Sequence, residues 1–182
     1  YFLNYFKPAV AEETEITRTG RRLMQDMGCT GCHRPSLVIQ HDRRVADVDT
    51  RFDPVRGIFN RLYATATPLF VEVPDGTGLP PLRQPKGGRF VVENFYADMR
   101  RHDLGPNFWE RNFDGSIQKQ FMTEPLWGVG STAPYGHDGR SVNLQEVILR
   151  HGGEAQSARD RYARSGAAAQ LAVREFLTSL VI

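Results

Sequence analysis

Two cysteines and a histidine stand together near the start of this 182-residue chain, in the run Cys29-Thr30-Gly31-Cys32-His33. Thiols three positions apart can form thioether bonds to the two vinyl groups of a haem, and the adjacent imidazole can then bind the iron as proximal ligand. The spacing therefore predicts one covalently attached haem c, held by Cys29, Cys32 and His33.

Two other uses of a Cys-x-x-Cys pair have to be compared with haem attachment. A redox-active dithiol opens a helix within a strand–helix–strand unit, and no such pattern surrounds Cys29. A zinc site needs further Cys or His ligands at matching spacing, and the chain has only two cysteines. The histidine that directly follows the pair favours haem over both alternatives.

A second axial ligand for the iron would come from another His or Met, unless that position stays open. The candidates are His41, His102, His137, His151, Met24, Met27, Met99 and Met122. His151 is the first choice, because it closes the apolar face of a predicted helix. The two glycines that follow it would let backbone approach a bulky group. His102 and Met122 come next.

Three helices are predicted from apolar residues at helical spacing, at residues 14–27, 143–152 and 167–180. Thr14 or Thr17 can cap the first helix, and Gly28 can end it directly before the haem motif. The small residues of the last helix would allow a close crossing near Gly20. A helix before the motif and a helix at the C-terminus are the elements that a small c-type cytochrome core needs.

Residues 41–119 have a different character. Strand patterns at 69–73 and 89–93, separated by turns rich in Pro and Gly, predict a hairpin with a long irregular loop. The expected fold is mostly α: a cytochrome c-like helical domain over residues 14–182, around one covalent haem, with an insertion at about 41–119. Residues 1–13 are expected to be a linker from a missing N-terminal domain or an arm packed on this one.

The overall composition argues against several classes of partner. Lys and Arg number 23 and Asp and Glu number 21, a balance that gives no reason to expect a nucleic-acid partner. No apolar run approaches the ~20 residues of a membrane span. Because haem c is attached outside the bacterial cytoplasm, a periplasmic location is expected.

Several further runs stand in a fixed order along the chain: His102-Asp103-Leu104-Gly105-Pro106, Pro125-Leu126-Trp127-Gly128, His137-Asp138-Gly139-Arg140 and His151-Gly152-Gly153-Glu154-Ala155. Together they resemble the C-terminal haem domain of the bacterial di-haem cytochrome c peroxidase superfamily, which includes the MauG-type enzymes. The resemblance is greatest to the di-haem oxidoreductase branch, and it covers residues 15–180.

The resemblance carries over to the haem ligands residue by residue. Cys29 and Cys32 match the thioether cysteines, and His33 matches the proximal ligand. His151 stands where peroxidases of the superfamily place a Met ligand and MauG-type enzymes a Tyr. A histidine at that position implies a six-coordinate haem with two His ligands.

Four more residues are assigned to the site. By the same resemblance, Thr132 and Pro134 match positions whose main-chain carbonyls hold a calcium ion, which makes calcium a second candidate cofactor. Trp127 is expected to line the haem pocket, either as plain packing or as an electron relay. Arg140 is expected either to pair with a haem propionate or to form a surface ion pair.

Members of the superfamily have two haem domains, whereas this chain has one Cys-x-x-Cys-His motif. The expected function is electron transfer through one haem, as the C-terminal haem domain or subunit of a di-haem peroxidase-like oxidoreductase. Its partner would be a second haem domain or a redox protein. Two alternatives stay open: peroxidase chemistry at this haem with His151 displaced, and a haem-bridging structural subunit of a larger multi-haem complex. No catalytic residue is assigned.

Overall fold

The computed structural model describes residues 9–10, 13–39, 48–53, 57–62 and 90–181. Contacts within the chain group into two units, one of residues 1–7 and 38–91 and the other of residues 8–37 and 92–182. The predicted strand at 69–73 and most of the predicted arm at 1–13 lie outside the described residues. All of the described candidate site residues belong to the larger unit, 8–37 and 92–182.

The α-helices described in the larger unit are α2 (Glu15–Asp26), α3 (Leu144–Arg150), α4 (Gln156–Arg164) and α5 (Ala167–Thr178). The predicted helices at 14–27, 143–152 and 167–180 are therefore confirmed, each with ends within two residues. Helix α4 was not predicted, because its sequence is polar and lacks an apolar stripe. Tyr162 is its one buried residue.

The start and end of α2 follow from local sequence. Thr14 is the N-cap, and its side-chain oxygen accepts from the Thr17 N–H at 3.3 Å, while the Thr14 N–H donates to the Thr17 side chain at 2.9 Å. Gly28 adopts the left-handed conformation, with φ of 84°, and its N–H donates to the Gln25 carbonyl. This turn ends the helix and places Cys29 at the start of the next one.

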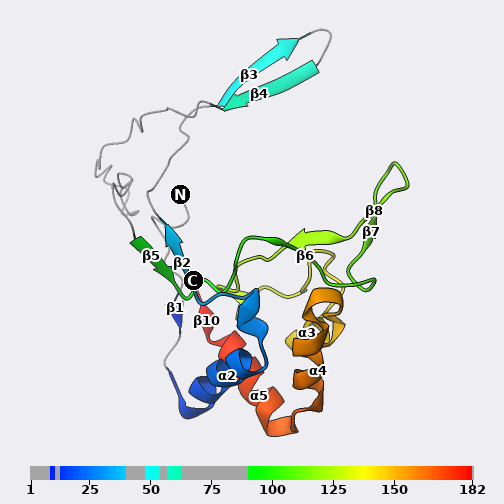
Figure 1. Ribbon diagram of the computed structural model, residues 1–182. Coiled ribbons are helices and arrows are strands. Elements are labelled where there is room, and N and C mark those ends of the chain that lie inside the picture. The colour runs from blue at the N-terminus through cyan, green and yellow to red at the C-terminus, as the bar shows by residue number, and fades with distance from the viewer. Residues whose placement is uncertain (1–8, 11–12, 40–47, 54–56, 63–89, 182) are drawn as a thin grey trace. The chain divides into compact units, whose positions relative to one another are not determined.

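Helices α2 and α5 pack against each other in close contact, and α3 and α4 lie beside them (Figure 1). Gly20 makes the close approach possible, because a Cβ atom there would lie 1.9 Å from the Ala172 carbonyl oxygen and 2.7 Å from the Phe176 Cβ. The crossing near Gly20 is as predicted. The core around it consists of Met24, Met27, Tyr96, Leu144, Tyr162, Val173, Phe176, Leu177 and Leu180.

Replacing Gly20 with alanine is expected to destabilise the protein by about 3 kcal/mol, because the added methyl group collides with backbone of α5 that cannot move without repacking the core. The sign of the change in unfolding free energy distinguishes a close crossing from an open one, since alanine in an open helix interior would instead stabilise the protein by about 1 kcal/mol. Urea unfolding measures the change. Gly166→Ala is the control, because its Cβ meets nothing within 4 Å. Equal stability of the two variants would contradict the crossing.

Short antiparallel strand pairs surround the helices of the larger unit: β1 (Ala9–Val10) with β10 (Leu180–Val181), β6 (Arg101–Asp103) with β9 (Gln120–Met122), and β7 (Glu110–Arg111) with β8 (Ile117–Gln118). The predicted strand at 89–93 is present as β5 (Phe90–Glu93), which pairs with β2 (Ser36–Ile39). The smaller unit holds a hairpin that was not predicted, β3 (Val48–Asp53) with β4 (Gly57–Leu62).

Residues 92–119, the last part of the predicted insertion at about 41–119, group with the larger unit. Backbone hydrogen bonds from Phe95 to Pro35 and from Ala97 to Arg34 tie this segment to the end of the haem motif. Tyr96 between them is buried in the core, with its ring edge-on to Phe176. In the described part of the chain, no helix is long and apolar enough to cross a membrane.

Candidate functional site

The Cys-x-x-Cys-His motif folds into a single tight turn. Residues Cys29–Gly31 form a 3₁₀ helix, and the N–H groups of Cys32 and His33 both donate to the Cys29 carbonyl, at 3.3 and 3.0 Å. Both cysteines are free thiols and partly buried. The turn thus presents two unpaired sulfurs and one imidazole together, as attachment of a haem requires.

The electrostatics of the two thiols differ from those of a redox dithiol. Burial raises the pKa of the Cys29 thiol above its ordinary value. Burial, with help from the nearby Asp98 and Glu154 carboxylates, also raises the pKa of Cys32. Reactive Cys-x-x-Cys pairs have a lowered thiol pKa instead. The environment of this pair therefore disfavours the dithiol alternative.

His33 and His151 come together although they are far apart in the sequence. Their ring centres are 6.4 Å apart, and the ring planes are inclined by 55°. Two imidazoles bound on opposite sides of one metal ion, each at about 2.0–2.1 Å, have ring centres a little over 6 Å apart. The observed spacing leaves room for one iron atom between the two rings.

Hydrogen bonds select the same ring nitrogen in both histidines. The Nδ1–H group of His33 donates to the Tyr96 carbonyl at 3.1 Å, and the Nδ1–H group of His151 donates to the Val147 carbonyl at 2.6 Å. Within the described residues, neither Nε2 atom has a hydrogen-bond partner. A metal-bound histidine shows the same arrangement, with one nitrogen on the metal and the other N–H on a carbonyl.

The protonation states also suit metal binding. Burial, and then the neighbouring His151, lowers the pKa of His33 to about 4 from an ordinary 6.5. Burial likewise lowers the pKa of His151. Both rings are therefore neutral at pH 7, as an imidazole ligand must be. Together with the two thiols, these rings fit a haem c.

His151 lies at the C-terminal end of helix α3, which positions it in the site. Asn143 caps the helix by accepting from the Glu146 N–H at 2.9 Å, and His151 is its C-cap residue. The two following glycines are predicted to let backbone approach a bulky group, whereas the neighbours they meet in the structure are backbone atoms of residues 103–105. The Gly152 N–H donates to the Leu104 carbonyl at 2.9 Å, and a Cβ on Gly153 would lie 2.2 Å from the Asp103 carbonyl oxygen.

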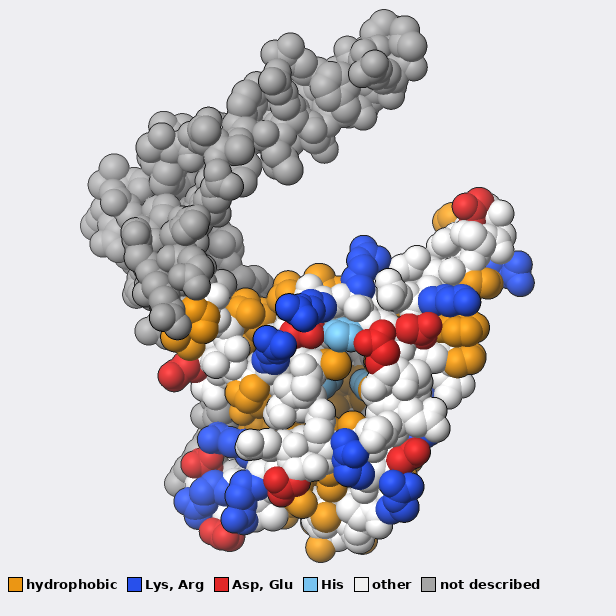
Figure 2. All heavy atoms as spheres, viewed as in Figure 1, with side chains coloured by type: hydrophobic (Ala, Val, Ile, Leu, Met, Phe, Trp, Pro, Cys, Tyr) orange, Lys and Arg blue, Asp and Glu red, His pale blue; other side chains and the backbone are white. Residues whose placement is uncertain are grey.

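The face of the larger unit drawn in Figure 2 has a hollow, with histidine side chains inside it and hydrophobic side chains around them. Phe108 forms part of the surroundings of His151, since its ring is 4% exposed and lies edge-on to the imidazole at 5.4 Å. The sequence did not point to Phe108, because no pattern links it to His151.

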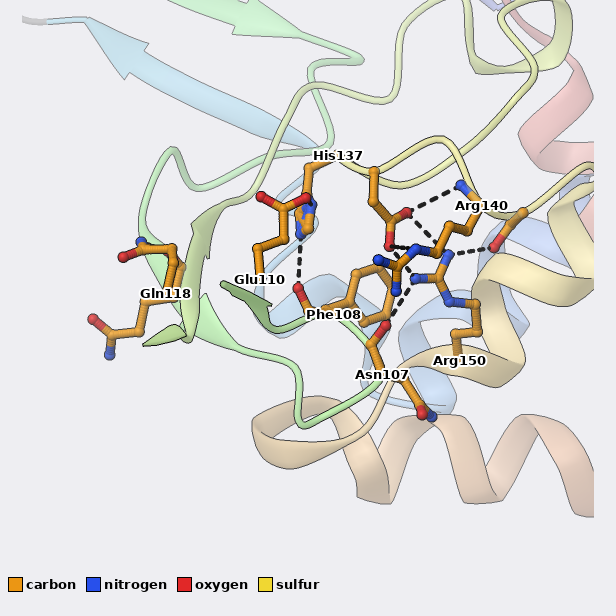
Figure 3. A network of polar contacts seen from close by, with 10 residues as sticks. Asn107, Phe108, Glu110, Gln118, His137, Arg140 and Arg150 are labelled. Carbon is orange, nitrogen blue, oxygen red and sulfur yellow. Dashed lines mark hydrogen bonds and ion pairs between the residues drawn. The ribbon is translucent and has the colours of Figure 1, made fainter. Parts of the chain in front are cut away.

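A polar network around Arg150 lies beside Phe108 (Figure 3). Arg150 binds both carboxylate oxygens of Asp138, at 2.5 and 3.2 Å, and also the Ser141 hydroxyl and the Asn107 carbonyl, each at 2.8 Å. Its guanidinium carbon lies 4.4 Å from the centre of the Phe108 ring. Sequence reasoning missed Arg150, although its position directly before His151 was the signal that could have found it.

The predicted roles of Arg140 and Trp127 can be compared with their positions. The Arg140 side chain is 64% exposed, and its Nε lies 3.5 Å from an Asp138 carboxylate oxygen, which corresponds to the surface ion pair among its two alternatives. Trp127 is partly buried, and its ring packs edge-on against Phe95 at 5.3 Å. Their assignment to a haem stays a prediction.

The predicted calcium positions, Thr132 and Pro134, lie in an exposed loop that follows the 3₁₀ turn Val129–Ser131. The fold brings neither of them to the two histidines by any hydrogen bond or ring contact in the described part of the chain. Calcium at this loop also stays a prediction.

The remaining candidates for the second axial ligand are placed elsewhere. Met24 and Met27 are buried in the core, whereas Met99 and Met122 are more than 40% exposed. The His137 Nε2–H donates to the Phe108 carbonyl at 2.8 Å. His41 lies outside the described residues. Of the described candidates, His151 is the one whose ring faces His33 at a ligand-pair spacing.

His102 occupies a charged cluster beside the haem motif. Its Nδ1 bonds to Glu154 at 2.8 Å and its Nε2 to Asp98 at 3.0 Å, and its Nδ1 is also 3.9 Å from the Cys32 sulfur. The hydrogen bond to Glu154, followed by the one to Asp98, raises the pKa of His102 above 6.5. The two carboxylates therefore favour the protonated, positively charged form of the imidazole.

This cluster predicts how stability depends on pH. Because the folded pKa of His102 is raised above its unfolded value of 6.5, its contribution is fully present below pH 6.5 and is lost as pH rises through the folded value. The free energy of unfolding should fall over that range in the parent protein. It should fall less in His102→Gln. Urea unfolding at a series of pH values tests this, and parallel curves for the two proteins would contradict it.

Comparison with known proteins identifies the family of this chain. The family described as "Di-haem oxidoreductase, putative peroxidase" matches residues 42–180, which is more than half of the chain. The matched residues include His102, Phe108, Arg150 and His151. No curated protein and no solved structure is significantly similar to the chain. On the family match, the chain belongs to the di-haem oxidoreductase family.

Proposed function

We propose that the larger unit is a cytochrome c-like domain that binds one covalent haem c and transfers electrons within a di-haem oxidoreductase. The observation that carries the proposal is the 6.4 Å spacing of the His33 and His151 rings beside the turn that holds Cys29 and Cys32. Membership of the family independently supports a haem cofactor, a redox role and a second haem domain.

Each residue of the site has a stated task. Cys29 and Cys32 hold the haem through thioether bonds, and His33 and His151 bind the iron through their Nε2 atoms. A haem held in this way supplies reversible one-electron chemistry between ferric and ferrous iron. If His33 and His151 both hold the iron, this chain would leave no position on it for peroxide.

The surrounding groups adjust the two ligands. The carbonyls of Tyr96 and Val147 accept from the Nδ1–H groups, which fixes the ring orientations and makes the Nε2 atoms more basic. Two basic imidazoles stabilise the ferric state relative to a His/Met pair, so we expect a potential on the low side of the haem range. Phe108 shields His151 from water.

The proposal extends to partners and location. The proposed electron partner is the second haem domain that the family implies or a separate redox protein. Membership of a larger complex, as one of its subunits, is part of the same proposal. We propose a periplasmic location, because haem c is attached outside the bacterial cytoplasm. Calcium at the loop of Thr132 and Pro134 is proposed on the resemblance alone.

A redox titration followed by optical spectroscopy tests the proposed function. The purified, haem-loaded chain should show one reversible one-electron transition at low potential, and it should not turn over hydrogen peroxide with a reduced electron donor. A pyridine haemochrome assay on the same sample measures haem content. Steady peroxide turnover by this chain alone would contradict the proposal and favour a peroxidase acting at this haem.

A further inference from the structure

We propose that two polar anchors, one on each side of His151 in the sequence, hold this ligand on the iron and thereby exclude small external ligands. The Asp138 anchor is the ion pair of Asp138 with Arg150. The Glu154 anchor is the hydrogen-bonded group of Glu154, His102 and Asp98. The inference rests on the proposed function, because it takes His151 as an axial ligand.

The Asp138 anchor holds the residue directly before His151. The Arg150 guanidinium binds both oxygens of Asp138, and the Asp138 side chain is only 4% exposed and that of Arg150 18%. An ion pair this well shielded from water is costly to break by removing one partner. The same guanidinium donates to the Asn107 carbonyl (Figure 3), which ties the end of α3 to the segment before β7.

Phe108 connects the Asp138 anchor to the imidazole ring of His151. Its own ring contacts both groups: the Arg150 guanidinium carbon lies 4.4 Å from the ring centre, and the His151 ring centre lies 5.4 Å from it. Its carbonyl accepts from the His137 Nε2–H at 2.8 Å, as the dashed line in Figure 3 marks. Phe108 is therefore fixed at both its ring and its backbone, and it blocks one direction in which the imidazole could swing.

The Glu154 anchor holds the chain three residues after His151. One carboxylate oxygen of Glu154 accepts from the Asp103 N–H at 2.9 Å, and the other bonds to His102 at 2.8 Å. The other ring nitrogen of His102 bonds to Asp98 at 3.0 Å. The segment after the ligand is thus tied to β6, which adds to the backbone bond between Gly152 and Leu104.

Each anchor separately restrains the movement of His151 away from the iron. The left-handed Gly153, packed against the Asp103 carbonyl, leaves the loop little room to rearrange while the Glu154 anchor holds. Asp138, Arg150, Phe108 and Glu154 are accordingly positioning residues that act through His151. Weakening either anchor should expose the iron to external ligands without removing any ligand.

Cyanide binding to the ferric, haem-loaded chain tests the inference. Asp138→Asn and Glu154→Gln each remove a charge from one anchor and keep the side-chain size. We expect cyanide to bind about tenfold to hundredfold more tightly to each variant than to the parent. The exposed carboxylates Asp114 and Glu15 provide matched controls, Asp114→Asn and Glu15→Gln, which should bind cyanide as the parent does.

The outcomes separate this inference from the proposed function. A low-spin parent whose Asp138→Asn and Glu154→Gln variants bind cyanide no better would overturn the anchors and leave the two-histidine ligation intact. A high-spin parent would overturn the ligation itself. If an anchor variant does not fold, Phe108→Leu provides a second test, because it keeps the site apolar and should also strengthen cyanide binding. An unchanged cyanide affinity in that variant would contradict the inference.

Discussion

Replacing His151 with alanine is expected to convert most of the ferric haem from low spin to high spin. The variant removes one of two imidazoles whose ring centres are 6.4 Å apart, so water or no ligand takes the open axial position. Optical spectra of the ferric protein measure the change. Far-UV circular dichroism of the same sample shows whether the helices remain.

Two further variants test whether His151 itself is the second ligand of the iron. Met122 is a rival ligand candidate and 43% exposed, so Met122→Ala should keep the parent spectrum. His151→Met should restore a low-spin haem and raise its reduction potential, since a His/Met pair favours the ferrous state more than two histidines do. A low-spin spectrum in His151→Ala would show that the sixth ligand is another residue.

Replacing Cys29 and Cys32 together with serine is expected to abolish covalent haem. Serine has the shape of cysteine but cannot form the thioether bonds, while His33 remains to bind the iron. Haem staining after denaturing electrophoresis should fall from full intensity to none. The variant should also lose thermal stability, because a group that binds only the folded protein stabilises it against unfolding.

Gly31→Ala is the matched control for the cysteine variant. Gly31 lies in the same turn, and a Cβ there would meet nothing within 4 Å, so haem should remain attached. Stain that survives denaturation in the double serine variant would place the attachment at another residue. The absence of covalent haem from the parent would leave Cys29 and Cys32 as free thiols and remove the basis of the proposed function.

Local signals in the sequence were sufficient to predict the helices that carry the site. Thr14 and Gly28 mark the ends of α2 through capping chemistry, which depends on neighbouring residues only. The small residue at Gly20 correctly indicated a close helix crossing. Helix α4 was not predicted because its sequence is polar and Tyr162 is its one buried residue, so no apolar stripe marks it.

The candidate site was predicted less completely than the helices. His33 and His151 could be singled out, one by its motif and the other by its place at a helix end. Asp138, Arg150 and Phe108 could not be connected from sequence, because their contacts join three separate segments. Arg140 was chosen because its guanidinium suits a carboxylate such as a haem propionate. The partly buried guanidinium on Asp138 belongs instead to Arg150.

The contacts of residues 92–119 could not be predicted from sequence either. Turn-forming residues and strand patterns predicted an irregular region up to residue 119, yet residues 92–119 group with the helices. The reason is tertiary. Backbone bonds from Phe95 and Ala97 reach the residues that follow His33, and the Tyr96 carbonyl accepts from His33 itself. A segment without helical periodicity thus supplies part of the site.

The ferric spectrum of the purified, haem-loaded protein tests the central claim most directly. The claim is that His33 and His151 bind one iron from opposite sides, so optical and electron paramagnetic resonance spectra should show a single low-spin species without the absorption band of Met–iron coordination. A high-spin ferric spectrum in the parent protein would contradict it, because it would leave at least one of these two imidazoles off the iron.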